Sequence, residues 1–137
     1  MLDVSLKGKK LLLIGGLNNT VDIIDLAHRN GVTIGVADYN KKTYAKSLAD
    51  YAHDVSAYDE DAMAKLCEEE RYDGIITAFN ERLGPIVRKL ADRLGMPTPF
   101  TVEQLQMSTN KKFFKHTCQQ YRVPVPQEYV IRSKEDI

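Results

Sequence analysis

Hydrophobic residues in the first hundred positions follow two alternating patterns. Short apolar runs are separated by longer stretches whose apolar residues recur at helical spacing. The short runs predict strands at residues 10–14, 32–37, 53–55 and 74–78. The clearest helical stretch lies between residues 83 and 94, and its apolar face consists of Leu83, Ile86, Val87, Leu90, Ala91 and Leu94.

Small polar residues and glycines mark where these helices begin and end. We expect a short helix from Thr43 to Ala49, a helix start at Ser56, and Asn80 as the cap of the next helix, which ends at Gly95. Strands that alternate with helices in this way indicate an α/β fold. The prediction is a doubly wound, Rossmann-like parallel sheet of about five strands with helices on both faces.

The composition changes after Gly95. Prolines at positions 97 and 99 predict a rigid, extended crossing, and Thr101 with Gln104 predicts a capping box at the start of a helix. Ser108 or Thr109 is expected to cap another helix, in which the aromatic side chains at positions 113 and 114 are expected to be partly exposed.

The last residues predict further elements. Residues 127–131 can form an edge strand, and Ser133 looks like another helix start. We therefore expect residues 1–100 to form one substrate domain, and residues 101–137 to be the truncated beginning of a second domain. The alternative is that the end of the chain is a disordered polar tail.

Charge and composition exclude several classes of partner. Nineteen basic and nineteen acidic side chains cancel, so the basic face that nucleic acids or membrane surfaces require is not indicated. No apolar run is long enough to span a bilayer, and no signal peptide is evident. The two cysteines and three histidines show no metal-ligand spacing, so no metal site is expected. These features favour a cytoplasmic location.

The loop after the first strand is the first candidate binding site, because ligands of such sheets lie beyond the carboxyl ends of the strands. Gly15, Gly16 and Asn18 lie where a helix begins, and unpaired N–H groups there can bind an anion or a carboxylate. The loop lacks the G-x-G-x-x-G pattern of dinucleotide-binding domains. A plain tight turn remains the alternative.

Four further residues could contact a ligand. Asp38 ends the second strand and could hold a ribose, although a role in forming the turn is favoured. Asn80 could cap a helix or contact substrate, and Arg82 could bind a carboxylate or be a solvated residue. Lys111 lies in the first turn of a helix, where a cation opposes the helix dipole. That placement indicates either an anionic partner or a solvated lysine.

Several segments together resemble ATP-grasp ligases. Residues 10–16, 36–40 and 49–50 resemble the domain that precedes the ATP-binding fold in these enzymes. Residues 108–114, followed by residues 121–126, resemble the entry into that fold. The nearest relatives would be the carbamoyl-phosphate-synthase-like and carboxylate–amine ligases. The order and spacing of the segments, which span nearly the whole chain, carry the resemblance.

The resemblance implies a reaction and a set of cofactors. In this family ATP, usually with Mg²⁺, converts a carboxylate to an acyl phosphate, which an amine or a thiol then attacks. Lys111 matches the lysine that contacts ATP phosphate, and the substrate-binding roles fall on Gly15, Gly16, Asn18, Asn80 and Arg82.

The sequence departs from the family pattern at two positions. Asn110 replaces the usual aspartate, which puts the support of Lys111 in doubt. Arg122 replaces the usual glycine, so the helix exit there needs strain or another conformation. Because most ATP and metal contacts of the family lie later in such proteins, this chain alone is expected to be inactive and to bind no cofactor tightly.

The expected partners are therefore a small carboxylate and an amine, and a homodimer is possible for this family. Two alternatives remain at this stage. The chain could be a stand-alone Rossmann-like module that binds a nucleotide or a small acid. It could also be a structural domain that docks a partner through the segment after Gly95.

Overall fold

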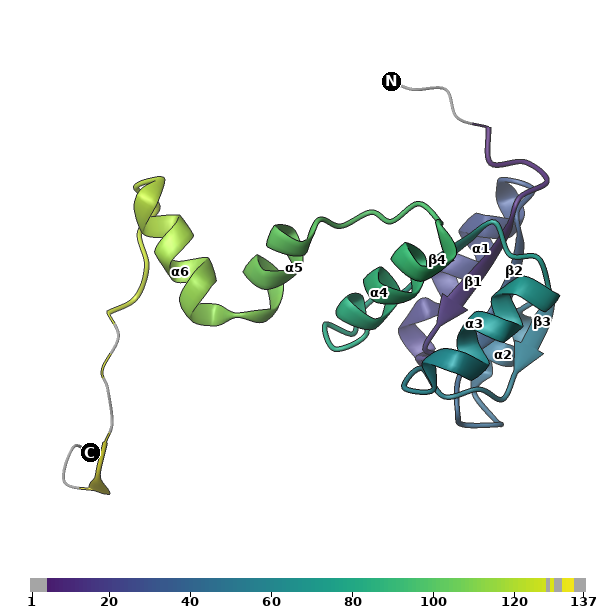
Figure 1. Cartoon of the computed structure of the whole chain (residues 1–137), viewed down its shortest axis with the longest axis horizontal. Helices are drawn as coiled ribbons and strands as arrows, with labels where there is room; N and C mark the ends of the chain where they lie inside the picture. The colour runs from purple at the N-terminus through teal and green to yellow at the C-terminus, as the bar shows by residue number, and fades with distance from the viewer. Residues whose placement is uncertain (1–4, 128, 130–131, 135–137) are drawn as a thin grey trace.

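The computed structural model describes residues 5–127, 129 and 132–134. Four strands among them form one parallel sheet in the order β3-β2-β1-β4 (Figure 1). Their bounds are β1 Lys10–Ile14, β2 Thr33–Ala37, β3 Tyr51–His53 and β4 Gly74–Ile76.

The apolar run of β1 lies at the centre of the sheet. Leu12 pairs with Gly35 of β2 on one side and with Ile75 of β4 on the other. Leu12, Leu13 and Ile14 are fully buried. The run is continuous because helices cover both faces, so each successive side chain is buried.

Two helices cover each face of the sheet. Helices α1 (Val21–Arg29) and α2 (Tyr44–Leu48) pack on the face that carries Leu13. Helices α3 (Glu60–Glu69) and α4 (Gly84–Leu94) pack on the face that carries Leu12. The doubly wound α/β fold expected from the sequence is confirmed. The described residues form four parallel strands, compared with the sheet of about five that the sequence predicted.

The third strand lies two residues earlier than predicted. Residues 53–55 were expected to form it, but β3 is Tyr51–His53. It is an edge strand whose first two residues are exposed, so no apolar run marks it. The backbone of Asp50 donates to Ile34 O at 2.9 Å, and its carboxylate accepts from Ile34 N at 2.8 Å. These bonds begin the pairing of the strand before Tyr51.

Two predictions near the end of the sequence fall partly on residues that the structure does not describe. The predicted fifth strand, 127–131, includes positions 128, 130 and 131, and the predicted helix start at Ser133 precedes positions 135–137. Both lie at least partly outside the described residues.

Two helices that pack on the sheet do not begin at their predicted cap residues. The cap of α3 is Asp59, whose carboxylate accepts from Ala62 N at 3.0 Å, and Ser56 instead accepts from Tyr58 N in a preceding turn. Asn80 does not cap α4: its side chain accepts from Arg82 N, and one further turn precedes the helix start at Gly84. Short polar side chains bond neighbouring backbone equally well in turns and caps, so their type alone does not distinguish the two.

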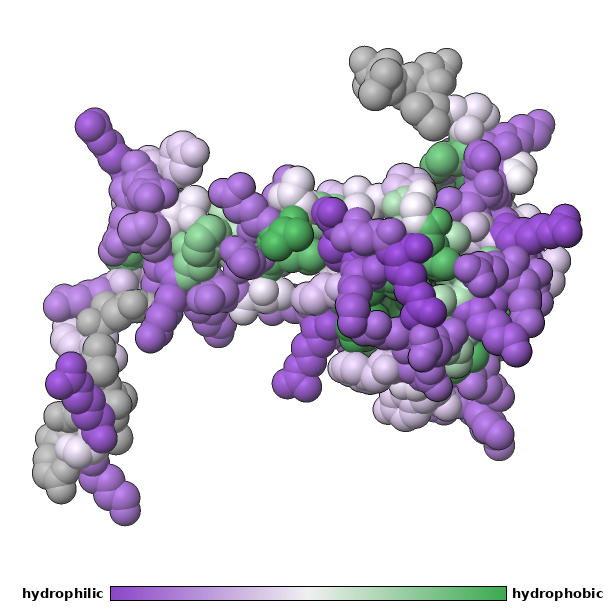
Figure 2. Space-filling view, in the orientation of Figure 1, coloured by the Kyte–Doolittle hydropathy of each residue, from purple (hydrophilic) through white to green (hydrophobic). Residues whose placement is uncertain are grey.

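Helices α5 (Val102–Thr109) and α6 (Lys111–Gln120) extend away from the sheet (Figure 1). We call residues 101–120 the helical arm and residues 9–95 the sheet body. The predicted capping box of Thr101 and Gln104 is present. Figure 2 shows hydrophobic surface along the arm as well as on the body. Neither helix of the arm has a buried residue.

The cap of α6 is Asn110, not Ser108 or Thr109. Its side-chain oxygen accepts from the backbone N–H groups of Lys112 and Phe113, both at 3.1 Å. The hydroxyls of Ser108 and Thr109 donate back to Leu105 O and so belong to the end of α5.

The aromatic residues and the exit of α6 agree with the sequence analysis. Phe113 is half-buried and Phe114 is 50 % exposed, as expected. Arg122, which replaces a glycine of the family pattern, has a φ of 57°. A left-handed backbone disfavours any residue with a Cβ, so the expected strain is present there.

Candidate functional site

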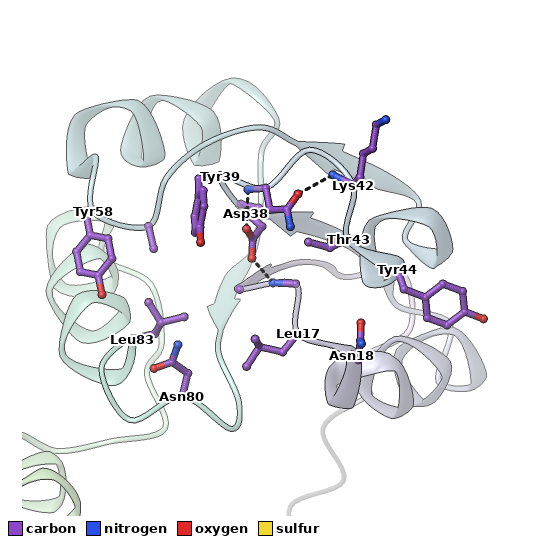
Figure 3. A pocket seen from close by; sticks show the side chains of 15 residues that line it. Leu17, Asn18, Asp38, Tyr39, Lys42, Thr43, Tyr44, Tyr58, Asn80 and Leu83 are labelled. Carbon is purple, nitrogen blue, oxygen red and sulfur yellow. Dashed lines mark hydrogen bonds between the residues drawn. The ribbon is translucent and has the colours of Figure 1, made fainter.

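A cavity of about 530 Å³ opens at the carboxyl edge of the sheet (Figure 3). The loops that follow β1, β2, β3 and β4 all contribute to it. Its walls consist of Gly15, Gly16, Leu17, Asn18, Ala37, Asp38, Tyr39, Asn40, Lys42, Thr43, Tyr44, Ala57, Tyr58, Asn80 and Leu83. Ligands of open α/β sheets bind at this edge.

Gly15 and Gly16 line the cavity, and neither position has room for a side chain. Gly15 has a φ of 94°, and a Cβ at this position would lie 2.8 Å from Leu83 Cδ1. A Cβ on Gly16 would lie 2.5 Å from Thr43 Oγ1. The loop after β1 therefore passes close to the loops after β2 and β4, which the sequence pattern alone does not show.

Asp38 joins the first two loops. Its Oδ2 atom accepts from Gly16 N at 2.7 Å, and its Oδ1 atom accepts from Asn40 N at 2.8 Å (Figure 3). The bond to Asn40 is the turn-forming contact that the sequence favoured over ribose binding. The bond to Gly16 connects two segments that are far apart in the chain, and no local pattern predicts it.

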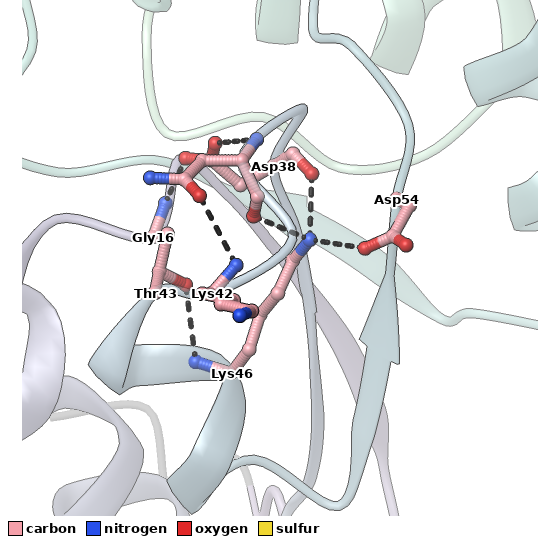
Figure 4. A network of polar contacts seen from close by, with 7 residues as sticks. Gly16, Asp38, Lys42, Thr43, Lys46 and Asp54 are labelled. Carbon is pink, nitrogen blue, oxygen red and sulfur yellow. Dashed lines mark hydrogen bonds and ion pairs between the residues drawn. The ribbon is translucent and has the colours of Figure 1, made fainter.

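Lys46 forms hydrogen bonds to the backbone of the cavity wall at residues 38 and 40. Its ammonium donates to Asp38 O at 2.7 Å, to Asn40 O at 2.8 Å and to Asp54 Oδ1 at 2.7 Å (Figure 4). The hydrogen bond from Lys46 lowers the pKa of Asp54. The sequence analysis missed this residue, because a lysine in a five-residue helix is typical of a solvated face.

Tyrosines line the outer part of the cavity and were also missed. Tyr39 follows Asp38, and Tyr58 lies in the loop before α3, where both side chains are largely exposed. Figure 3 shows both rings on the side of the cavity where Leu83 and Asn80 lie. Aromatic walls with a few polar groups are typical of sites for small organic molecules.

The structure brings together four of the six residues to which the family resemblance assigns a role. Gly15, Gly16, Asn18 and Asn80 all line the cavity. The residue before Asn80, Phe79, has a φ of 60°, and such strained backbone is frequent at binding sites.

The other two candidates lie outside the cavity. Arg82 is exposed, does not line the cavity and donates its backbone N–H to Asn80 Oδ1 at 3.1 Å. Lys111 is an exposed residue at the first position of α6, in the helical arm. The predicted substrate and phosphate contacts therefore occupy two separate parts of the described structure.

The cavity has the chemistry of a binding site. Its polar side chains are three asparagine amides, tyrosine hydroxyls, the Thr43 hydroxyl, the Asp38 carboxylate and the Lys42 ammonium. No three His, Cys, Asp or Glu side chains gather to hold a metal ion anywhere in the described part of the chain. Nor does any helix in that part have the length and apolar character needed to cross a membrane.

The chain is similar in fold to several solved ligase structures. The chain matches an L-amino acid ligase from Bacillus licheniformis with a TM-score of 0.77 and 18 % identity, over 96 % of this chain and 34 % of that one. The chain has the fold of the N-terminal part of ATP-grasp ligases. The expected resemblance is thus confirmed for the fold.

Two further structures support the same assignment. An ADP complex of N5-carboxyaminoimidazole ribonucleotide synthetase matches with a TM-score of 0.72 and 23 % identity, over 93 % of this chain and 33 % of that one. Phosphoribosylglycinamide synthetase from Anaerococcus prevotii matches with a TM-score of 0.68 and 16 % identity, with the same coverage. The chain spans about a third of the length of these proteins. Comparison with protein-family models and with curated sequences finds no match.

Proposed function

We propose that this chain is the N-terminal part of an ATP-dependent ligase that activates a carboxylate as an acyl phosphate for attack by an amine or a thiol. In this proposal the chain binds the non-nucleotide substrate. The observation that carries the proposal is the match of nearly the whole chain to the first third of ligases with this fold.

The cavity supports this role for the sheet body. Gly15 and Gly16 allow a ligand to approach the backbone, and Asn18 and Asn80 can bond its polar groups from two different loops. We propose these four residues as substrate contacts. Arg82, adjacent to the cavity wall through Asn80, would contact substrate only after a change of its side-chain position.

The helical arm would begin the nucleotide-binding part. We propose a boundary that divides residues 1–100 from residues 101–137, with Lys111 as a contact to ATP phosphate. The described residues do not by themselves fit a complete ATP and Mg²⁺ site, because they offer no cluster of metal ligands. Tight ATP binding and the phosphoryl-transfer step are therefore not assigned to this chain, which we propose is inactive alone.

The remaining parts of the proposal concern partners and location. We propose small-molecule carboxylate and amine substrates, no nucleic-acid or membrane partner, a cytoplasmic location and a possible homodimer. The balanced charge supports the exclusion of nucleic-acid and membrane partners.

A second candidate is a stand-alone module that binds a nucleotide or a small acid. One observation favours it: every residue that lines the cavity belongs to the sheet body. The cavity is thus formed without any contribution from the helical arm.

Titration of the chain with Mg-ATP, and separately with NAD, distinguishes the two candidates. The ligase proposal expects very weak or no binding of either nucleotide by the chain alone. Tight binding of ATP or NAD would contradict it and support the stand-alone module.

A screen of small carboxylic acids and amines by amide NMR tests the site itself. A ligand of the cavity should shift the amide signals of Gly16, Asn18 and Asn80 and leave those of α6 unchanged. In a longer protein that contains this chain, ADP formation should require a carboxylate, its repeated turnover should also require an amine or a thiol, and Lys111→Ala should reduce it. ADP release that needs neither substrate would count against the proposal.

A further inference from the structure

Lys46 is an unusual residue for its position. It is only 7 % exposed, although lysine is almost never fully buried unless it is paired. It lies in α2, a helix of five residues that packs against the sheet beside the cavity. A buried ammonium loses the solvation of its charge, so its protein contacts must replace that solvation.

The contacts of Lys46 match its bonding capacity. An ammonium has three N–H donors and no acceptor. The three donors meet two backbone carbonyls, of Asp38 and Asn40, and the carboxylate of Asp54, all within 2.7–2.8 Å. The group is therefore coordinated from three sides, as a bound cation would be.

These contacts connect the cavity wall to the sheet. Asp54 follows β3, and Asp38 and Asn40 form the wall after β2. The Asp38 carboxylate in turn accepts from Gly16 N of the first loop. A continuous path of hydrogen bonds thus runs from Asp54 through Lys46 and Asp38 to Gly16 (Figure 4).

We propose that Lys46 is a positioning residue, whose ammonium acts as a tethered internal cation that fixes residues 38–40 so that Asp38 holds the Gly16 loop in its binding conformation. Its importance for substrate binding rests on the proposed function, whereas the cross-link itself does not. Other side chains cannot replace it: methionine donates no hydrogen bond, and the planar guanidinium of arginine has a different geometry.

Hydrogen exchange of backbone amides, measured by NMR on the whole chain, tests this proposal without any ligand. In Lys46→Met we expect the amides of Gly16 and Asn40 to exchange at least about tenfold faster than in the wild type, because the bonds to Asp38 that protect them are released. The amide of Leu13, in the central strand, should keep its protection.

Two controls separate this effect from a general loss of stability. Lys65→Met makes the same substitution at an exposed helical lysine and should leave Gly16 unchanged. Met63→Ala destabilises the core on the other face of the sheet and should affect Leu13 and Gly16 alike. If Lys46→Met does not fold, Asp54→Asn can replace it in the same exchange measurement. This substitution weakens one of the three bonds of Lys46, at a half-exposed residue.

Addition of small cations gives a second, independent measurement. Lys46→Ala leaves space for a primary alkylammonium ion, so propylammonium should restore the protection of Gly16, whereas tetramethylammonium, which has no N–H donor, should not. Wild-type protection of Gly16 in folded Lys46→Met, or equal effects of both cations on Lys46→Ala, would overturn the proposal. Failure of these tests leaves the nucleotide and substrate titrations unaffected, so the two proposals can fail separately.

Discussion

Helices α4 and α6 have similar lengths and similar amphipathic patterns but different surroundings. In α4, the side chains of Val87, Leu90 and Ala91 are buried against the sheet. In α6, no residue is buried, although the helix carries two phenylalanines. The same kind of sequence pattern therefore belongs to a core in the sheet body and to a surface in the helical arm.

The two regions consequently depend on different forces. Burial of apolar surface stabilises the body, in addition to side-chain caps such as Asp59 at the start of α3. The helices of the arm bury no residue and have mainly local bonds: a capping box starts α5 and Asn110 caps α6. Isolated helices as short as these are marginal in water. We infer that the body determines the global stability and that the arm responds to local changes.

Truncation of one large apolar side chain in each region gives the largest expected contrast. Leu90→Ala removes a side chain that is 2 % exposed, and we expect it to lower the free energy of unfolding by about 2–5 kcal/mol. Phe114→Ala removes a half-exposed ring and should cost less than about 1 kcal/mol. Urea denaturation followed by circular dichroism measures both.

Equal losses for the two variants would contradict this division. Such a result would mean that the arm and the body unfold as one unit.

A close approach inside the body gives the next largest effect. A Cβ added at Gly35 would lie 1.9 Å from the hydroxyl of Tyr72, which bonds His53 Nε2 at 2.7 Å. Gly35→Ala should therefore destabilise the protein by about 1–3 kcal/mol, as overpacking of a core does. Because Tyr72→Phe removes the clashing oxygen, the double variant should be more stable than the sum of the single effects predicts.

Additive effects in this double-mutant cycle would contradict the contact. Gly95→Ala is the matched control, since a Cβ there would meet no atom within 4 Å and Tyr72→Phe should not change its effect.

The contrast between the regions also explains what the sequence could predict. Strands β1 and β2, the start of β4 and the face of α4 were predicted because burial on both sides leaves continuous apolar runs and regular spacing, although β4 ends at Ile76 and not at residue 78. The edge strand β3 was misplaced because its exposed residues carry no such signal. The caps of α3, α4 and α6 were misplaced because short polar side chains bond nearby backbone in turns and at helix ends as well, whereas the capping box of α5 was predicted correctly.

The candidate site was predictable only in part, for a related reason. The loops after β1 and β4 follow from the rule on carboxyl ends, and residues from both line the cavity. The bridge from Asp38 to Gly16 and the burial of Lys46 depend on segments that meet only in the folded chain. The sequence around a lysine whose ammonium is buried and hydrogen-bonded does not differ from that around a solvated lysine.

A local change in the arm has a smaller expected effect. Asn110→Ala removes the two cap bonds to Lys112 and Phe113 and should destabilise α6 by about 1 kcal/mol. If the arm is independent, the amides of α6 should exchange several-fold faster while the urea midpoint of the body stays unchanged. Asn110→Asp keeps the acceptor and should preserve protection. A shift of the body's urea midpoint in Asn110→Ala would show that the two regions unfold together.

The smallest expected effect is a dependence of the body's stability on pH through His53. Burial lowers the pKa of this histidine below its ordinary value of 6.5, and the cations Lys10 and Lys46 lower it further, whereas Glu70 opposes them. The unfolded chain therefore binds a proton at a higher pH than the folded chain does. Stability should be complete above pH 6.5 and should fall as the pH decreases through the lowered pKa of His53. Urea midpoints at pH 7.5 and pH 5.5 should differ in the wild type and differ less in His53→Gln. His116→Gln, the same substitution in the exposed arm, should retain the wild-type difference. An unchanged difference in His53→Gln would assign the pH dependence to other groups.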